Sequence, residues 1–322
     1  MVEFNRPEHR AVAAALRTMD HDLLSRCKCW FGGGTEIVLE LGEYRLSKDM
    51  DFLCSDADGY REIRSLVASR GASALFGGDV RQERAFRSDQ YGVRGIISVS
   101  GIPLRFEIVR EGRIGLGGRS DLALGVPRLV EADRIAEKML ANADRCQDRS
   151  TACRDAVDLG MLALYRGPFP EASLEKAEHA YGDEVVQKIS WVLERLSDDE
   201  ERGRAATSLG MDRSLLDAAV RALAGEFRCL RPGAFSSLLV QVPLHPRRTH
   251  MVDAALDGQQ IKIRQRPAVG DILGRLDNPL GPAVVSPGNQ AYFLEDVRFV
   301  DVSEWHKAVS LRAAEANATL PR

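Results

Sequence analysis

The sequence predicts an α+β protein, in which a small mixed sheet flanked by helices precedes a helical region and a small α/β C-terminal extension. Short β-type runs and helix-period segments alternate over the first 110 residues, and helix-period segments then follow one another from residue 131 to 227. A chain of 322 residues is long enough for more than one domain. We therefore expect domains at 1–125, 126–230 and 231–322.

The first region alternates between predicted helices and strands. Apolar residues at a helical period predict a helix over 6–26, with Pro7 in its first turn, and another over 35–42. Residues 29–31 and 50–54 are typical of short strands, and the loop 43–48 precedes the second of them. Residues 58–70 predict a helix that stops at Gly71, whereas 74–90 mixes glycine, arginine and aromatic residues and has room for one strand.

A hairpin signal comes next, with strands over 93–100 and 102–109 joined at Ser100-Gly101. In the second strand, PLRFEIVR, the side-chain period of two places Glu107 on the mainly polar side. A glycine-rich connection, 113–125, leads to predicted helices over 131–145, 151–165, 172–180, 184–196 and 213–227. Strand-like runs in the extension lie at 236–242, 260–263, 291–293 and 297–302.

Composition excludes several partners and locations. The net charge of −3 and a pI near 6.1 give no global positive field, so we expect no DNA partner. Six cysteines include no CxxC spacing, which favours free thiols in a reducing compartment. The first ten residues are polar, and no run approaches the roughly 18 apolar residues of a membrane span. These features predict a cytoplasmic protein without a membrane partner.

One stretch, FGGGTEIVLELGEYRLSKDMDFL at 31–53, opens with a glycine turn. Glycines lack Cβ atoms, so the backbone amides of Gly33 and Gly34 can approach phosphate oxygens closely. Thr35 adds a hydroxyl at the start of the predicted helix, where the helix dipole favours an anion. Three glycines alone more often form a simple turn, so the prediction of a phosphate site depends on the acidic residues further along the stretch.

Acidic residues close the same stretch. Asp49 and Asp51 alternate along a strand and therefore share one side of it. Carboxylates are the hard oxygen ligands that Mg²⁺ prefers, and nucleotidyl transfer typically uses two metal ions. Glu107, on the hairpin, is the best candidate for a third carboxylate ligand, although by itself it would more often be an exposed strand residue.

The order of strand, Gly-Gly, helix and Asp-hydrophobic-Asp resembles the nucleotidyltransferase superfamily, which has the DNA polymerase β-like fold. The sequence is closely similar to the AbiEii/AbiGii toxin-like nucleotidyltransferases, which carry GGT, Arg-x-Ser and Asp-hydrophobic-Asp-Phe. The matching residues are Gly33, Gly34, Thr35, Arg45, Ser47, Asp49, Asp51 and Phe52. The resemblance implies that Arg45 and Ser47 contact the phosphates of a bound NTP.

The second part of the resemblance lies in the helical region. The family has a lysine on one helix and Arg-Asp-x-x-Asp on the next, and this chain has Lys138 and then Arg154, Asp155 and Asp158. The resemblance implies that Lys138 brings charge to the triphosphate, that Arg154 binds nucleotide and that Asp158 orients the lysine or the base. Without the upstream motif, a surface set of ion pairs would be the preferred interpretation. The resemblance covers about 10–164.

The resemblance implies a metal-dependent enzyme that moves an NMP from an NTP to an acceptor with two Mg²⁺ ions, or Mn²⁺. It further implies the toxin of a toxin–antitoxin or phage-defence system, with RNA (the tRNA 3′ end) as acceptor and an antitoxin as partner. Alternatives are a small-molecule or protein hydroxyl as acceptor, a non-catalytic member that binds nucleotide or a partner, and an interaction protein with a coincidental motif. The basic clusters at 246–248 and 262–266 favour a solvated face over an RNA contact, and the role of 231–322 stays open.

Overall fold

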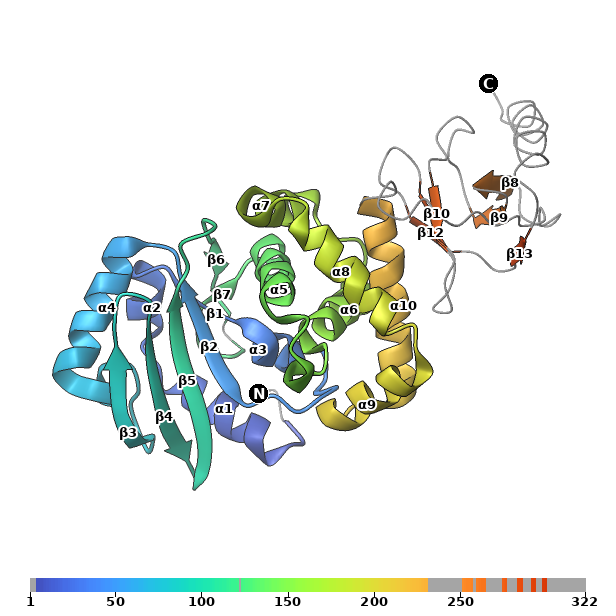
Figure 1. Ribbon diagram of the computed structural model, residues 1–322. Coiled ribbons are helices and arrows are strands. Elements are labelled where there is room, and N and C mark those ends of the chain that lie inside the picture. The colour runs from blue at the N-terminus through green and yellow to red at the C-terminus, as the bar shows by residue number, and fades with distance from the viewer. Residues whose placement is uncertain are drawn as a thin grey trace. The chain divides into compact units, whose positions relative to one another are not determined.

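A mixed α/β arrangement is present in the computed structural model, which describes residues 4–121 and 123–230 and six short strands between 251 and 299 (Figure 1). The chain forms two compact units. The first comprises the described residues of Met1–Arg145, Pro170–Gly182 and Thr207–Asp212, and the second those of Cys146–Phe169, Asp183–Ala206 and Arg213–Arg322. These units are interleaved along the chain. The domain boundaries expected at 125 and 230 stay a prediction.

The first unit is built on a seven-stranded sheet in the order β3-β4-β5-β2-β1-β7-β6 (Figure 1). Its strands are β1 (Cys29–Gly32), β2 (Asp49–Cys54), β3 (Arg81–Ser88), β4 (Gly92–Val99), β5 (Ile102–Arg110), β6 (Gly118–Arg119) and β7 (Arg128–Leu129). Two pairs, β2 with β5 and β1 with β7, are parallel, and the other neighbours are antiparallel. The predicted α+β fold with a mixed sheet is confirmed.

One face of this sheet forms the core of the unit. Side chains from α1 (Pro7–Arg17), α2 (His21–Arg26) and α4 (Ala57–Arg70) join those of the sheet in a single hydrophobic cluster. Phe52 and Phe106 lie within it with ring centroids 5.8 Å apart. Because strand side chains alternate, the residues on either side of Phe52 and Phe106 along β2 and β5 belong to the opposite face.

The predicted single helix over 6–26 is wrong, because the chain breaks between α1 and α2. The N–H and the hydroxyl of Thr18 both donate to the carbonyl of Ala15, which ends α1. Asp20 then begins α2 by accepting a hydrogen bond from the N–H of Leu23, a typical N-cap. The first unit also contains the site helices α3 (Gly33–Glu40) and α5 (Glu131–Arg145), together with α7 (Glu171–Tyr181) and the 3₁₀ turn Gly71–Ala74.

The hairpin of β4 and β5 turns at Ser100 and Gly101, as predicted. Both residues have positive φ, 51° and 79°, which is the requirement of a two-residue type I′ turn. The segment 74–90, for which the sequence allowed one strand, contains β3.

The second unit is mainly helical up to residue 230. Its main helices are α6 (Arg154–Arg166), α8 (Glu184–Arg195) and α10 (Arg213–Leu230), close to the predicted ranges, and a short 3₁₀ turn covers Arg149–Thr151. Gly160 allows α6 to approach α10 closely, since a Cβ atom there would lie 2.3 Å from the carbonyl oxygen of Ala219. The sequence did not predict α9 (Asp199–Leu209), which has a weak apolar face.

Beyond α10, the structure describes two three-stranded antiparallel sheets, in the orders β10-β11-β12 and β13-β9-β8. Their strands are β8 (Met251–Leu256), β9 (Gln259–Arg264), β10 (Gly274–Leu276), β11 (Ala283–Val285), β12 (Ala291–Phe293) and β13 (Val297–Phe299). The predicted strands near 260, 291 and 297 are confirmed, and the predicted strand 236–242 lies outside the described residues. In the part of the chain that is described, no helix is long and apolar enough to cross a membrane.

Candidate active site

Three carboxylates gather on the face of the sheet opposite the hydrophobic core. Asp51 pairs in register with Glu107 across the parallel strands β2 and β5, so the two side chains are direct neighbours. Asp49 lies two residues earlier on β2 and therefore shares this face. The sequence predicted Asp49 and Asp51 to lie on one side with Glu107 on a neighbouring strand, and the register places Glu107 directly beside Asp51, with Asp49 two residues away along the same strand.

The glycine turn lies directly against this acid pair. Gly32, the last residue of β1, is opposite Asp51 in the antiparallel register of β1 and β2. Gly33 then turns the chain into α3 with φ +72°, and a Cβ atom on it would lie 2.6 Å from Oδ2 of Asp51. Only glycine fits both the backbone conformation and the space. Gly34 and Thr35 are the next residues of α3, so the start of this helix lies beside Asp51.

We expect Gly33→Ala to impair transfer far more than stability. The left-handed backbone costs a Cβ-bearing residue about 1–2 kcal/mol, and the new methyl group displaces the Asp51 carboxylate. A misplacement of about 1 Å at a reacting centre can cost about a hundredfold in rate. The matched control is Gly42→Ala, which has φ +82° and no atom within 4 Å of its Cβ position. Urea unfolding and label transfer from an NTP compare them, and equal rates in the two variants would contradict the assigned role of Gly33.

A chain of hydrogen bonds fixes the polar loop before the acids. The hydroxyls of Thr35 and Ser47 share a hydrogen bond of 2.7 Å, and the N–H of Ser47 donates to Nε2 of His9 at 3.2 Å. Because Nε2 accepts, the proton of the neutral imidazole lies on Nδ1, which donates to Glu43 at 2.8 Å. His9 and Thr35 are fully buried. The sequence singled out Thr35 and Ser47 as phosphate contacts but not the histidine that holds Ser47.

Glu43 anchors this chain of bonds to the N-terminal segment. Although burial alone would raise its pKa, hydrogen bonds from the N–H groups of Asn5 and Arg6, at 2.6 and 2.9 Å, and from His9 hold the pKa of Glu43 below its usual range. The carboxylate is therefore ionised at neutral pH and keeps the imidazole of His9 oriented toward Ser47.

Arg45 is packed within the loop that carries Ser47. Its side chain is 3% exposed, its guanidinium donates to the carbonyl of Leu46 at 3.0 Å, and it stacks 5.9 Å from the ring centroid of Tyr44. The residue is thus built into the loop that carries Ser47. A direct contact between Arg45 and an NTP phosphate stays a prediction.

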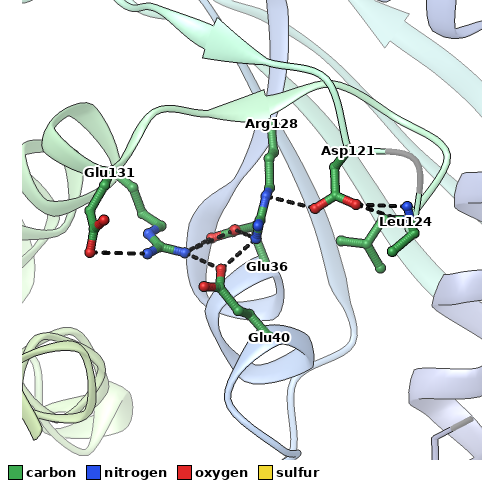
Figure 2. Close-up of polar contacts among 8 residues, drawn as sticks. Glu36, Glu40, Asp121, Leu124, Arg128 and Glu131 are labelled. Carbon is green, nitrogen blue, oxygen red and sulfur yellow. Dashed lines mark hydrogen bonds and ion pairs between the residues drawn. The ribbon is translucent and has the colours of Figure 1, made fainter. Parts of the chain in front are cut away.

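A buried ion network holds α3 against the rest of the first unit (Figure 2). The carboxylate of Glu36, which is fully buried, accepts from Arg128 at 2.9 Å and from Arg134 at 3.1 Å. Both arginines also contact Glu40, one helical turn further along α3, and Arg128 forms an ion pair with Asp121 at 2.8 Å. Figure 2 shows these side chains converging from three segments of the chain. The network fixes the helix that begins at the glycine turn.

The same network connects α3 to the helix of the predicted lysine. Arg134 and Lys138 lie one turn apart on α5, and both are buried. Because Arg134 holds α5 in place, it also holds Lys138 in place relative to the start of α3. Lys138 acts electrostatically on Asp51, which places its charge within range of the acid pair. The prediction that Lys138 belongs to this site gains this support from the structure.

The environment of the acid pair disfavours the ionised form of Asp51. Burial, and after it the neighbouring Asp49 carboxylate, raises the pKa of Asp51 to about 6. Lys138 opposes this rise and Glu107 adds to it. A buried carboxyl whose pKa is raised beside a second carboxylate is the environment of functional acids and metal ligands.

We expect Lys138→Ala to shift the pH dependence of transfer as well as the NTP requirement. Removing the ammonium group leaves the charged form of Asp51 less stable, so the pKa of that carboxyl rises further above 6. The acid limb of the rate profile should then move to higher pH, and the NTP concentration for half-maximal rate should increase. Lys28→Ala, an exposed lysine paired with Asp56, is the control. An unchanged pH profile in Lys138→Ala would show that the helical motif is structural.

The donor set suits a hard divalent cation. Among the residues whose side chains are described, no group of three or more His, Cys, Asp or Glu side chains is already arranged as a metal site. Glu107 instead accepts from Nε of Arg94 at 2.6 Å. Asp49 and Asp51, two carboxylates on the same side of β2, fit Mg²⁺ chemically, and Glu107 lies next to Asp51 in register. Metal binding by these three residues stays a prediction.

The second predicted motif falls in the other unit. Arg154, Asp155 and Asp158 begin α6, where Asp155 and Asp158 are buried and Arg154 is partly exposed. Two carboxylates buried on one helix turn are unusual for a surface ion-pair set. Their predicted roles in nucleotide binding and catalysis stay predictions.

A cavity of about 560 Å³ opens over the sheet beside the acids. Its charged lining comprises Asp49, Asp51, Glu107, Arg84, Arg87, Arg94 and Arg105. Sequence reasoning did not identify these four arginines. A signal was present in RQERAFRS, at 81–88, where three arginines fall within one strand, but the strand itself was not assigned.

A comparison with protein-family models matches residues 15–226, more than half of the chain, to "Nucleotidyl transferase AbiEii toxin, Type IV TA system". The chain belongs to the AbiEii nucleotidyltransferase toxin family. The match includes the glycine turn, the acid pair, Lys138 and the motif on α6. Membership makes the protein a nucleotidyltransferase and confirms the resemblance that the sequence motifs carried.

Other comparisons add less. One solved structure, "Crystal structure of putative nucleotidyltransferase from H. pylori", is 18% identical and covers 67% of this chain and 95% of its own, with a TM-score of 0.33. At that TM-score the likeness carries no weight, and the assignment rests on the family model. No curated protein matches the chain.

Proposed function

We propose that this AbiEii-family enzyme transfers an NMP from an NTP to an RNA acceptor, specifically at a tRNA 3′ end, with two Mg²⁺ ions held by Asp49, Asp51 and Glu107. The observation that carries the proposal is the position of Gly33 against Asp51 on an open sheet face, next to Glu107. A phosphate turn and an acid pair in contact are what a metal-bound triphosphate requires. Mn²⁺ is the alternative metal.

In this proposal, each part of the site has a separate role in binding the NTP. Backbone amides of Gly33 and Gly34, the dipole of α3 and the hydroxyls of Thr35 and Ser47 bind phosphate oxygens. When bound, the metal ions neutralise charge on the phosphates and lower the pKa of the attacking hydroxyl. Lys138 supplies a further positive charge close to Asp51.

Residues of α6 belong to the same proposal. Arg154 contacts the nucleotide, and Asp158 orients Lys138 or the base. Both assignments follow the family motif, and the burial of Asp158 supports a specific role for this carboxylate, since a fully buried acid requires a compensating partner.

The biological setting is inferred from the family. We propose that the enzyme is the toxin of a toxin–antitoxin pair with a role in phage defence and that a cognate antitoxin is its partner. The family description supports the toxin–antitoxin pair, because it names a Type IV toxin–antitoxin system. A cytoplasmic location, where NTPs and tRNA are found, belongs to the same proposal.

Incubation with each α-³²P-labelled NTP, Mg²⁺ and bulk tRNA tests the proposal. Label that migrates with RNA, is lost with EDTA and is absent in Asp49→Asn supports it. Label on protein or on a small molecule would establish a different acceptor. NTP binding without any turnover would instead identify a non-catalytic member that binds nucleotide or a partner.

A further inference from the structure

An arginine-rich surface covers the outer strands of the sheet, on the same face as the acids. We call it the arginine face and define it as Arg84 and Arg87 on β3, Arg94 on β4 and Arg105 on β5. All four residues line the cavity beside the acid pair. Arg94 is opposite Glu107 in the register of β4 and β5, and Arg105 is opposite Asp49 in that of β2 and β5.

A β-bulge creates the outer part of this face. Three positions separate Arg84 from Arg87, so in a regular strand the two side chains would point to opposite faces. The register instead pairs Arg84 with Ile96 and Arg87 with Arg94, which are only two positions apart on β4. The extra residue of the bulge therefore brings both arginines to the side of the acids.

Three of these four arginines form no ion pair among the described residues. Arg84, Arg87 and Arg105 are exposed, and within the described part of the chain none of them has an ion pair or a hydrogen bond from its side chain. Arg94 differs, because it contacts Glu107 and lies 3.5 Å from Asp89. Buried arginines of the same unit, such as Arg128, are paired with carboxylates. The cavity thus has carboxylates at β2 and β5 and, toward β3, exposed guanidinium groups without ion pairs, and this outer part favours an anionic ligand.

The sheet order separates this face from the phosphate turn. The turn comes directly after β1 on one side of β2, while β5, β4 and β3 lie on the other side. The acids of β2 thus stand between the residues that bind the triphosphate and the arginine face. In nucleotidyl transfer the metal ligands stand between the NTP phosphates and the attacking hydroxyl. The arginine face is consequently on the acceptor side of the reaction.

The extent of the face exceeds one phosphate group. Two strand spacings of about 4.8 Å separate β5 from β3, or about 10 Å in all. One strand of a nucleic-acid duplex carries a charge about every 3.4 Å along its axis, so this distance can accommodate several phosphates. Forked guanidinium groups also match phosphate geometry better than lysine does.

We propose that the arginine face binds the phosphate backbone of the RNA acceptor and directs its terminal hydroxyl to the acid pair. This inference rests on the proposed function and names the surface that holds its substrate. The net charge of −3 is consistent with it, since the positive charge is local rather than global. A solvated surface and a second contact to the NTP are the competing explanations.

The test uses the full-length protein with Arg84→Gln and Arg87→Gln combined, since both side chains are exposed and without partners among the described residues. The matched control combines Arg26→Gln and Arg61→Gln, two exposed arginines on α2 and α4. Affinity for fluorescein-labelled bulk tRNA is measured without NTP across a KCl series. Affinity for a fluorescent NTP with Mg²⁺ is measured separately, and thermal unfolding confirms that each variant folds.

We expect the arginine-face variant to bind tRNA roughly tenfold more weakly and to lose about 1.4–1.8 from the slope of log K against log salt, for two phosphate contacts. NTP affinity should match that of the wild type, and the control should match it in both assays. Unchanged tRNA affinity and slope would overturn the inference, as would a loss confined to NTP binding. These assays do not require turnover, so absence of RNA labelling by the wild type would instead count against the proposed function.

Discussion

We expect that replacing Asp51 by asparagine nearly abolishes transfer and, at the same time, raises the thermal stability of the metal-free protein at pH 8. The first effect arises from removing a carboxylate of the proposed metal site, and we expect a loss of at least about a thousandfold. The second arises from the raised pKa of Asp51, about 6 in the folded protein against 3.8 for an unperturbed aspartate. The charge that the proposed metal site requires thus destabilises the native protein.

The stability gained from Asp51→Asn increases as the pH rises. A carboxyl with a raised folded pKa binds its proton more tightly in the native state, so ionising it costs stability as pH rises from about 4 through about 6. The cost is complete above about 6 and absent below about 4. A shift of about two units corresponds to at most roughly 3 kcal/mol, and about 1–3 kcal/mol is our expected gain for Asp51→Asn at pH 8. The gain should vanish near pH 4.

Mg²⁺ or Mn²⁺ titration completes this experiment. A cation that neutralises the acid pair should raise the unfolding temperature of the wild type at pH 8 and leave that of Asp51→Asn unchanged. Asp58→Asn, an exposed acid at the start of α4, should behave as the wild type. If Asp51→Asn is less stable than the wild type without metal, or if both gain equally from the cation, the assignment of Asp51 to a metal site is wrong.

The sequence could predict those features of the site that depend on neighbouring residues along one strand or turn. Alternation along β2 is sufficient to place Asp49 and Asp51 on one side. The glycine turn suggested a close approach to phosphate, whereas the contact of Gly33 with Asp51 depends on the register of β1 and β2. Alternation also placed Glu107 correctly, because β5 is a regular strand. The parallel register that brings Glu107 next to Asp51 depends on the whole sheet, so local pattern alone could not predict it.

The residues that sequence reasoning missed depend on irregular or distant contacts. Arg84 and Arg87 share a face only because of the bulge in β3, and nothing in RQERAFRS specifies where an extra residue is accommodated. His9 contacts Glu43 and Ser47 across a separation of 34 and 38 residues. Glu36, within the glycine-turn motif, has the pattern of an ordinary helix residue, and its partners come from β7 and α5 far along the chain.

The largest loss of stability is expected from Glu36→Ala. Glu36 is fully buried between Arg128 and Arg134, and removing its carboxylate leaves two buried guanidinium groups with less compensation. Breaking a buried ion pair by deleting one partner typically costs about 3–5 kcal/mol. Glu62→Ala is the matched control, because Glu62 forms an exposed ion pair with Arg26 that should contribute less than about 1 kcal/mol. Urea unfolding monitored by circular dichroism measures both.

We expect the ion network around Glu36 to affect the rate of nucleotide transfer as well as stability. Glu36 is one residue after Thr35 on α3, and its partner Arg134 is one turn before Lys138 on α5, so loosening the network displaces the phosphate turn and the lysine together. Glu36→Gln, which keeps the shape and one hydrogen-bond acceptor, should recover part of the stability but little of the rate, because the amide cannot neutralise both arginines. If Glu36→Gln transfers nucleotide at the wild-type rate, the network stabilises the fold without positioning the site.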